Sequence, residues 1–140
     1  MILCVAVDDH MGMMFNRRRQ SQDRRLRSYL MELVGDRRLW INAYTKTQFE
    51  EPLPGNIIVD DHFLDRAANE DFCFAEDVSL ADYGDRVKKV IFFKWNSVYP
   101  ADQQFDLPMQ QTEWKPGRVA EFEGYSHKKI TVEEWQHECT

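Results

Sequence analysis

The spacing of apolar residues changes along the chain, and this change predicts a fold of mixed α and β structure. The unbroken apolar run at residues 2–7 is typical of a buried strand. From about residue 19 to residue 33 the apolar residues recur at helical spacing, and Gly35 supplies a stop. Between these segments, Gly12 is the expected flexible point of a turn. The buried face of the predicted helix consists of Leu26, Leu30, Leu33 and Val34.

The rest of the pattern predicts short strands and two weaker helical segments. Strands are predicted at residues 39–41, 56–59, 72–75, 90–93 and 114–122, the last interrupted by Pro116 and Gly117. Polar helical turns are predicted at residues 45–50 and 80–86. Residues 128–136 are ambiguous, because they fit both a helical capping box and a β-branched strand.

This order of elements indicates a single α/β domain over residues 1–140, with no linker. Strands and helices alternate in the first half, and strands crowd the second half. We therefore expect a central mixed sheet flanked by helices, with antiparallel strands at the C-terminal end. A chain of 140 residues is long enough for one such core.

Positive charge is concentrated in one short segment of an acidic chain. Residues 17–27 hold six arginines and one aspartate, a net charge of +5, while the whole chain is at −6 and the rest is therefore at −11. This asymmetry points to a small anionic ligand or an acidic partner. Nucleic-acid binding is not expected, because it requires a broad basic surface.

Nothing in the pattern indicates a membrane span or a secretory signal, so we expect a cytoplasmic protein. The opening apolar run is short and is followed at once by Asp8 and Asp9. Cys4, Cys73 and Cys139 lack the spacing of a zinc site, and Cys4 and Cys73 are expected to be reduced thiols in the core.

The order of segments and several short motifs resemble the dihydrofolate reductase family. The first strand and Gly12 resemble that family's opening strand and glycine-containing loop, and Phe15 and Asn16 lie where the family has a Trp-Asn pair. The Leu-Pro-Gly turn at residues 53–55 and the Asp-x-x-Phe segment at residues 102–105 are also similar. Ser126 and His127, with the residues after them, resemble the family's final hairpin, which favours a strand at residues 128–136. The resemblance implies the dihydrofolate reductase fold.

Departures from the family pattern imply that its nicotinamide cofactor is not bound. Where the family has a Gly-Gly pair after its fifth strand, this chain has Ala75, Glu76 and Asp77, and two carboxylates repel a pyrophosphate. Residues 42–45 lack the family's arginine, and the segment between residues 59 and 72 is too short for the elements of its adenosine side. We therefore expect no cofactor and no ordinary dihydrofolate reduction.

The first candidate ligand-binding residues lie at the start of the predicted helix. The resemblance places Asp23 near the family's substrate-binding carboxylate. Alternatively, Asp23 is a surface acid that complements the helix dipole and pairs with Arg19 or Arg27. Arg17, Arg18 and Arg19, beside free helix N–H groups, suit phosphate. The alternative is a solvated basic face covered by acidic loops of this chain or of a second subunit, which would make a homo-oligomer.

The second candidates follow the strand at residues 90–93. Lys94 is expected either to pair with Asp23 across a cleft or to lie on the outer face of the sheet. Trp95 and Asn96 come next, and an aromatic beside a basic helix suits ring stacking, although aromatics at strand ends are more often core residues. We expect a cleft between the helix start at residues 16–23 and residues 94–96 to bind a small anionic or nucleotide-like ligand, or to serve as an interaction module.

The sequence also contains residues that could form a divalent-metal site or a serine hydrolase triad. Asp8, Asp9, Asp60 and Asp61 follow strands, and carboxylates that met there would suit Mg²⁺. This supports an alternative function, a divalent-metal-dependent phosphodiester hydrolase of nuclease type. Turn-forming acids explain the same residues more simply, and no metal site is expected. The Ser-His pair at residues 126–127 lacks a G-x-S-x-G motif, so no serine hydrolase triad is expected.

Overall fold

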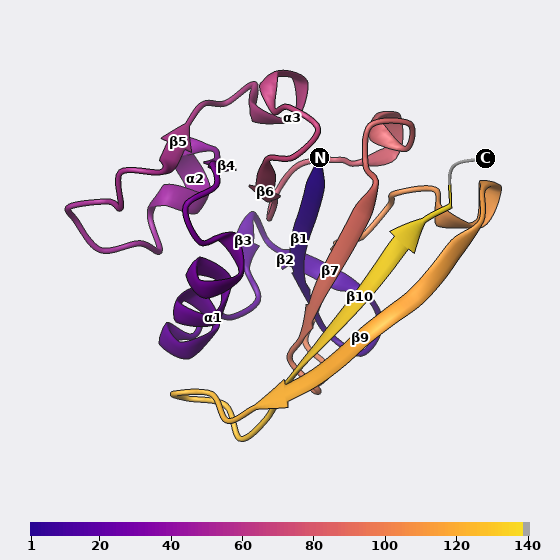
Figure 1. Cartoon of the computed structure of the whole chain (residues 1–140). Helices are drawn as coiled ribbons and strands as arrows, with labels where there is room; N and C mark the ends of the chain where they lie inside the picture. The colour runs from indigo at the N-terminus through magenta and orange to yellow at the C-terminus, as the bar shows by residue number, and fades with distance from the viewer. Residues whose placement is uncertain (139–140) are drawn as a thin grey trace.

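The computed structural model describes residues 1–138 as two sheets with short helices around them (Figure 1). The large sheet contains β1 (Ile2–Val7), β4 (Leu39–Ile41), β5 (Ile57–Val59), β6 (Phe72–Phe74), β7 (Lys89–Lys94), β9 (Trp114–Phe122) and β10 (Ile130–His137). The small sheet contains β2 (Gly12–Phe15), β3 (Arg18–Arg19) and β8 (Gln103–Gln104). The helices are α1 (Arg24–Val34), α2 (Ala43–Lys46) and α3 (Phe63–Arg66), with 3-10 turns η1 (Ala81–Tyr83) and η2 (Met109–Gln111). Within this part of the chain, no helix combines the length and apolar character needed to span a membrane.

The large sheet is mixed, as predicted. Its strand order is β5-β4-β6-β1-β7-β10-β9. β1 pairs in parallel with β6 and β7, and β4 pairs in parallel with β5 and β6. β10 runs antiparallel to both β7 and β9. The predicted single α/β domain with antiparallel C-terminal strands is therefore confirmed.

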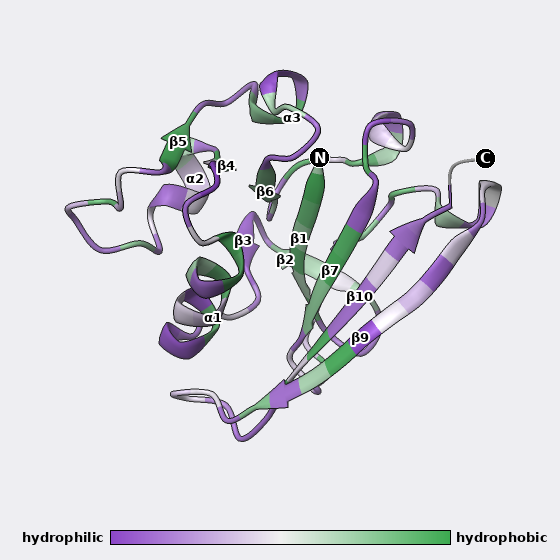
Figure 2. Cartoon of the chain, viewed as in Figure 1, coloured by the Kyte–Doolittle hydropathy of each residue, from purple (hydrophilic) through white to green (hydrophobic). Residues whose placement is uncertain are grey.

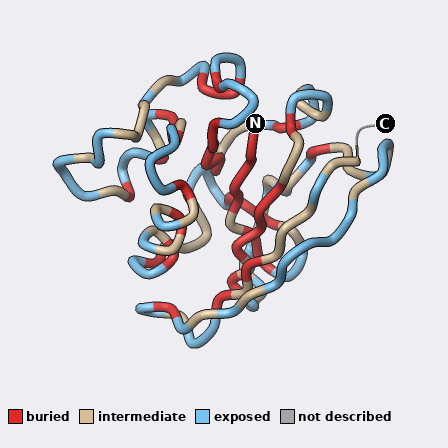
Figure 3. Tube along the Cα trace, in the orientation of Figure 1, coloured by how far each residue is buried: buried red, intermediate tan, exposed pale blue. Residues whose placement is uncertain are grey.

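Both faces of the central strand β1 are buried, because other elements pack against each side of the sheet. On one face Leu3 and Val5 pack with residues of β2 and α3, and on the other Ile2 and Cys4 pack with residues of α1. The apolar and buried parts of the chain coincide along β1 and β7 (Figures 2 and 3). Unbroken apolar runs are typical of strands buried on both sides.

The two predicted core thiols are confirmed. Cys4 and Cys73 are fully buried and unbridged. Burial raises the pKa of both thiols, that of Cys73 to about 12, so neither ionises near neutral pH. Cys139 lies outside the described residues.

α1 begins later than predicted. Arg18 and Arg19 do not continue the helix but pair with Phe15 and Met14 as β3. The hairpin between β2 and β3 turns through Asn16 and Arg17, at φ 54° and 61°. Asp23 then caps the helix. The predicted face is otherwise confirmed for Leu26, Leu30 and Val34, while Leu33 is only partly buried.

The ambiguous segment at residues 128–136 contains a strand, which excludes the capping-box helix. β10 is paired along its length with β7 on one side and β9 on the other, so ladder hydrogen bonds outweigh the local helical signal. Pro116 and Gly117 are tolerated within β9 because β9 is an edge strand.

Smaller differences concern turns and short elements. The left-handed residue of the first turn is Met11, at φ 62°, while Gly12 begins β2. A Cβ on Gly12 would lie 2.6 Å from Gln20 Nε2 and 2.7 Å from Ala101 Cβ, so this glycine permits close packing. The helical turns predicted at residues 45–50 and 80–86 differ in their bounds: α2 begins earlier and ends at Lys46, and the 3-10 turn η1 covers only Ala81–Tyr83. The pattern missed β2, β8, α3 and η2, which are too short for a periodic signal.

Candidate functional site

Asp23 joins the start of α1 to the loop between β9 and β10. It is buried, and its Oδ1 accepts hydrogen bonds from the backbone N–H groups of Arg25 at 2.9 Å and Leu26 at 3.3 Å. The loop reaches beneath α1 (Figure 1) and donates the N–H groups of Tyr125 and Ser126 to the same carboxylate, each at 3.0 Å. One carboxylate therefore completes both a helix N-terminus and a hairpin loop.

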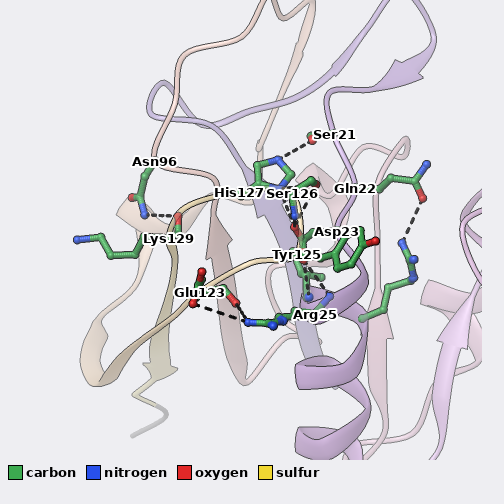
Figure 4. Close-up of polar contacts among 12 residues, drawn as sticks. Ser21, Gln22, Asp23, Arg25, Asn96, Glu123, Tyr125, Ser126, His127 and Lys129 are labelled. Atoms are coloured by element: carbon green, nitrogen blue, oxygen red, sulfur yellow. Dashed lines mark hydrogen bonds and ion pairs between the residues drawn. The ribbon is translucent and has the colours of Figure 1, made fainter.

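His127 lies between Asp23 and Ser21 (Figure 4). Its Nδ1 is 2.7 Å from Asp23 Oδ2, and its Nε2 is 2.8 Å from Ser21 Oγ. The ring stacks on Trp95, with centroids 4.5 Å apart, and its side chain is 12% exposed. Because an ionised carboxylate only accepts hydrogen bonds, Nδ1 carries a proton, and in the neutral ring Nε2 is the acceptor.

The Asp23 carboxylate is held in its ionised form. Burial alone would raise its pKa, but hydrogen bonds from the Tyr125 N–H, the His127 ring and the Ser126 N–H outweigh burial. The pKa of Asp23 is therefore held well below the ordinary value of an aspartate.

Two arginines of the cationic segment fasten the same loop. The Arg24 guanidinium lies 4.6 Å from the centre of the Tyr125 ring, and Arg25 Nη1 donates to the Glu123 carbonyl at 3.3 Å. Between these contacts, a Cβ on Gly124 would lie 2.8 Å from Asp23 Oδ2 and 2.7 Å from the His127 carbonyl oxygen. Any side chain at position 124 would therefore collide with the Asp23 carboxylate, and glycine allows the loop to pack against it.

A cavity of about 400 Å³ adjoins this network, and we call it the His127 pocket. Its lining includes Trp95, Asn96, Tyr99, His127, Lys128 and Lys129. Lys128 and Lys129 are exposed, and Lys129 Nζ is 3.5 Å from a carboxylate oxygen of Glu121. The lining of the pocket therefore combines aromatic residues with two lysines, one of which is paired with a carboxylate.

Asp8 positions the Tyr99 side of this pocket. It is buried at the end of β1 and accepts hydrogen bonds from the N–H groups of Gly12 at 2.7 Å and Tyr99 at 3.1 Å, and from Gln20 Nε2 at 3.1 Å. Burial would raise the pKa of Asp8, but these hydrogen bonds lower it below its ordinary value. The carboxylate of Asp8 therefore accepts hydrogen bonds from groups of the fold itself.

The predicted ion pairs of Asp23 with Arg19 and with Lys94 are wrong. Arg19 instead pairs with Glu76, through Nε at 2.9 Å and Nη2 at 3.2 Å, and also donates to Thr47 Oγ1. An acidic group of the same chain therefore covers this arginine. Asp23 accepts hydrogen bonds from helix N–H groups and from the loop, and His127 takes the place of the expected cation.

The predicted phosphate site at the helix entrance is also not formed as expected. Asn16, Arg17 and Arg18 are exposed on the β2–β3 hairpin, before the helix begins. Asp23 occupies the N–H groups of Arg25 and Leu26 that were expected to be free. Binding of a ligand by the exposed residues stays a prediction.

Lys94 lies on the opposite face of the sheet from Trp95, because consecutive strand residues alternate in direction. Its ammonium is 2.9 Å from Glu133 Oε2, and it lines a separate cavity of about 640 Å³ with Trp114 and Trp135. Of residues 94–96, the structure therefore places Trp95 and Asn96 in the His127 pocket and Lys94 in another.

The strand-end aspartates do not meet. Asp8 follows β1 and Asp60 follows β5, but β6 and β4 lie between those strands, so three strand spacings of about 4.8 Å separate their ends. Asp60 pairs with Arg66, and Asp61 accepts the Ala43 N–H. Across residues 1–138 no three acidic, histidine or cysteine side chains gather as a metal site. The geometry required by the nuclease-type alternative is therefore absent from these aspartates.

Scans against models of protein families and against curated proteins find no match. Among solved structures, the chain is similar to a dihydrofolate reductase from Enterococcus faecalis complexed with NADP(H) and RAB-propyl. The TM-score is 0.67 at 7% sequence identity, and the match covers 99% of this chain and 96% of the other. This similarity confirms the predicted dihydrofolate reductase-like fold.

Proposed function

We propose that this chain, a dihydrofolate reductase-like fold, binds a small anionic, nucleotide-like ligand in the His127 pocket. The observation that carries the proposal is the pairing of Trp95 and Tyr99 with Lys128 and Lys129 around one cavity. The partly exposed ring of Tyr99 suits a planar base or ring, and the lysines suit a phosphate or carboxylate.

Three residues of the pocket lining are held in place by contacts within the fold. Trp95 is 4% exposed and stacks on His127, which Asp23 holds in place. Asn96, at φ 59°, donates its amide to the Lys129 carbonyl at 3.2 Å and to Thr131 Oγ1 at 2.9 Å. A binding site whose walls are already ordered loses little conformational entropy when the ligand enters.

Calorimetric titration with adenosine monophosphate, adenosine and inorganic phosphate tests this proposal. We expect the nucleotide to bind more tightly than either fragment, and the double change Lys128→Gln with Lys129→Gln to weaken it at least about tenfold. The matched control is Lys46→Gln with Lys115→Gln, which removes the same charge elsewhere and should retain the affinity. Equal weakening in both double variants, or no binding of any probe at millimolar concentration, would contradict the proposal.

The chain should not bind a nicotinamide dinucleotide in the reductase manner. Where the resemblance places the pyrophosphate, Ala75 is fully buried and Glu76 is used in the ion pair with Arg19. Asp77 adds a second carboxylate, whose Oδ1 accepts a hydrogen bond from Asn42. Titration with NADPH at low salt is expected to give no micromolar affinity. Micromolar binding that is lost on changing residues 75–77 would instead indicate an oxidoreductase.

A further inference from the structure

We propose that Ser21, His127 and Asp23 form a nucleophilic site that cleaves a small carboxylic ester carrying a negative charge. The inference rests on the proposed function, because the same pocket would hold the anionic part of the substrate. The three side chains are connected in the order needed for such chemistry: hydroxyl, imidazole and buried carboxylate.

The two nitrogens of His127 have different roles. Nδ1 faces the Asp23 carboxylate at 2.7 Å, so its proton is fixed there. Nε2 therefore presents its lone pair to the Ser21 hydroxyl at 2.8 Å, within reach for proton transfer. Asp23 is a positioning residue in this arrangement: it fixes the tautomer and stabilises the ring when the ring becomes positively charged.

The imidazole is also fixed in space. It stacks on buried Trp95, and the loop that carries it is fastened to Asp23 by the backbone N–H groups of Tyr125 and Ser126. These contacts already attach the loop to the helix, so attachment does not require the Ser21 contact. Ser21 is partly exposed, while Asp23 is buried behind the ring. The nucleophile is thus on the solvent side and the carboxylate on the protein side.

The reaction follows from these positions. Ser21 Oγ forms a bond to the ester carbonyl carbon while its proton moves to His127 Nε2. The bond to the alcohol then breaks, and the alcohol leaves with that proton. Water, activated by the same nitrogen, adds to the acyl-serine and releases the acid and the free hydroxyl. Lys128 and Lys129 place positive charge beside the pocket, which favours a substrate with a carboxylate or phosphate group.

Covalent labelling with an alkyl fluorophosphonate tests the site directly. The Ser21 oxygen should displace fluoride from phosphorus, and peptide mass spectrometry should locate the adduct on Ser21. We expect Ser21→Ala to abolish labelling and His127→Gln to slow it at least about 100-fold. Ser28→Ala is the matched control, because Ser28 is an exposed serine of α1 whose hydroxyl donates to the Arg24 carbonyl; the labelling rate of this variant should equal that of the wild-type protein.

Several outcomes would overturn the inference. These are no Ser21 adduct under conditions that label a known serine hydrolase, an adduct on Ser126, or an unchanged rate in His127→Gln. The wild-type adduct is decisive even if a variant fails to fold. The proposed ligand binding is judged separately: nucleotide binding without labelling refutes only this inference, and labelling without charge-dependent binding refutes only the proposed ligand.

Discussion

Replacing Asp23 with alanine should lower the free energy of unfolding by about 3 kcal/mol. Loss of a helix cap costs about 1 kcal/mol, and each buried N–H group left without an acceptor costs about 1–3 kcal/mol. In this protein the change removes the acceptor of Arg25 and Leu26 in the helix and of Tyr125 and Ser126 in the loop. Denaturant titration measures the loss, and a value under about 1 kcal/mol would show that the loop is not fastened through this carboxylate.

The pH dependence of the free energy of unfolding provides an independent check on the role of Asp23. The pKa of Asp23 is lower in the folded state than the ordinary aspartate value of about 3.9. The ionised Asp23 carboxylate therefore contributes fully to the free energy of unfolding above about pH 5. This contribution declines as pH falls below the unfolded-state pKa toward the lower folded-state pKa. The stability difference between wild type and Asp23→Ala should narrow over this acid range. Asp36→Ala is the control: Asp36 is exposed, and its loss should cost less than about 0.5 kcal/mol at every pH.

The sequence predicts this fold well where the signal is local and long. Unbroken apolar runs identify β1 and β7, and helical spacing identifies the buried face of α1. The same runs hide the orientation of Lys94, because a strand buried on both faces shows no alternation that would separate it from Trp95. The helix start is missed for a related reason: Arg18 and Arg19 are good helix formers, but pairing with β2 overrides their propensity.

The candidate site is harder to predict because its parts are far apart in the chain. Asp23 and His127 are separated by 104 positions, and no spacing rule connects them. A motif search for a nucleophile elbow misses Ser21, since Arg19 and Asp23 stand where the G-x-S-x-G motif has its two glycines. The one available signal was the resemblance itself, which placed Asp23 beside a ligand and Ser126 and His127 in the final hairpin. Tertiary contact then brings these two predicted segments together.

Arg19, in the cationic segment, pairs with Glu76 of the same chain, which indicates a role in stability. Replacing Glu76 tests this role. Its side chain is 7% exposed and that of Arg19 is 16% exposed. Breaking a buried ion pair by removing one partner costs about 3–5 kcal/mol. Arg19 keeps Thr47 Oγ1 and the Tyr44 carbonyl as acceptors, so we expect Glu76→Ala to cost about 3 kcal/mol, at the lower end of this range.

Two further variants separate this structural role from a ligand-binding one. Arg19→Met combined with Glu76→Leu should cost less than Glu76→Ala, because no uncompensated charge then remains buried. Glu51→Ala breaks an exposed pair with Lys46 and should cost less than about 1 kcal/mol. If Glu76→Ala costs no more than Glu51→Ala, Arg19 is free to bind an anion and belongs with Arg17 and Arg18 as a ligand residue. The expected larger cost assigns Arg19 to the stability of the fold, where its guanidinium is held by Glu76.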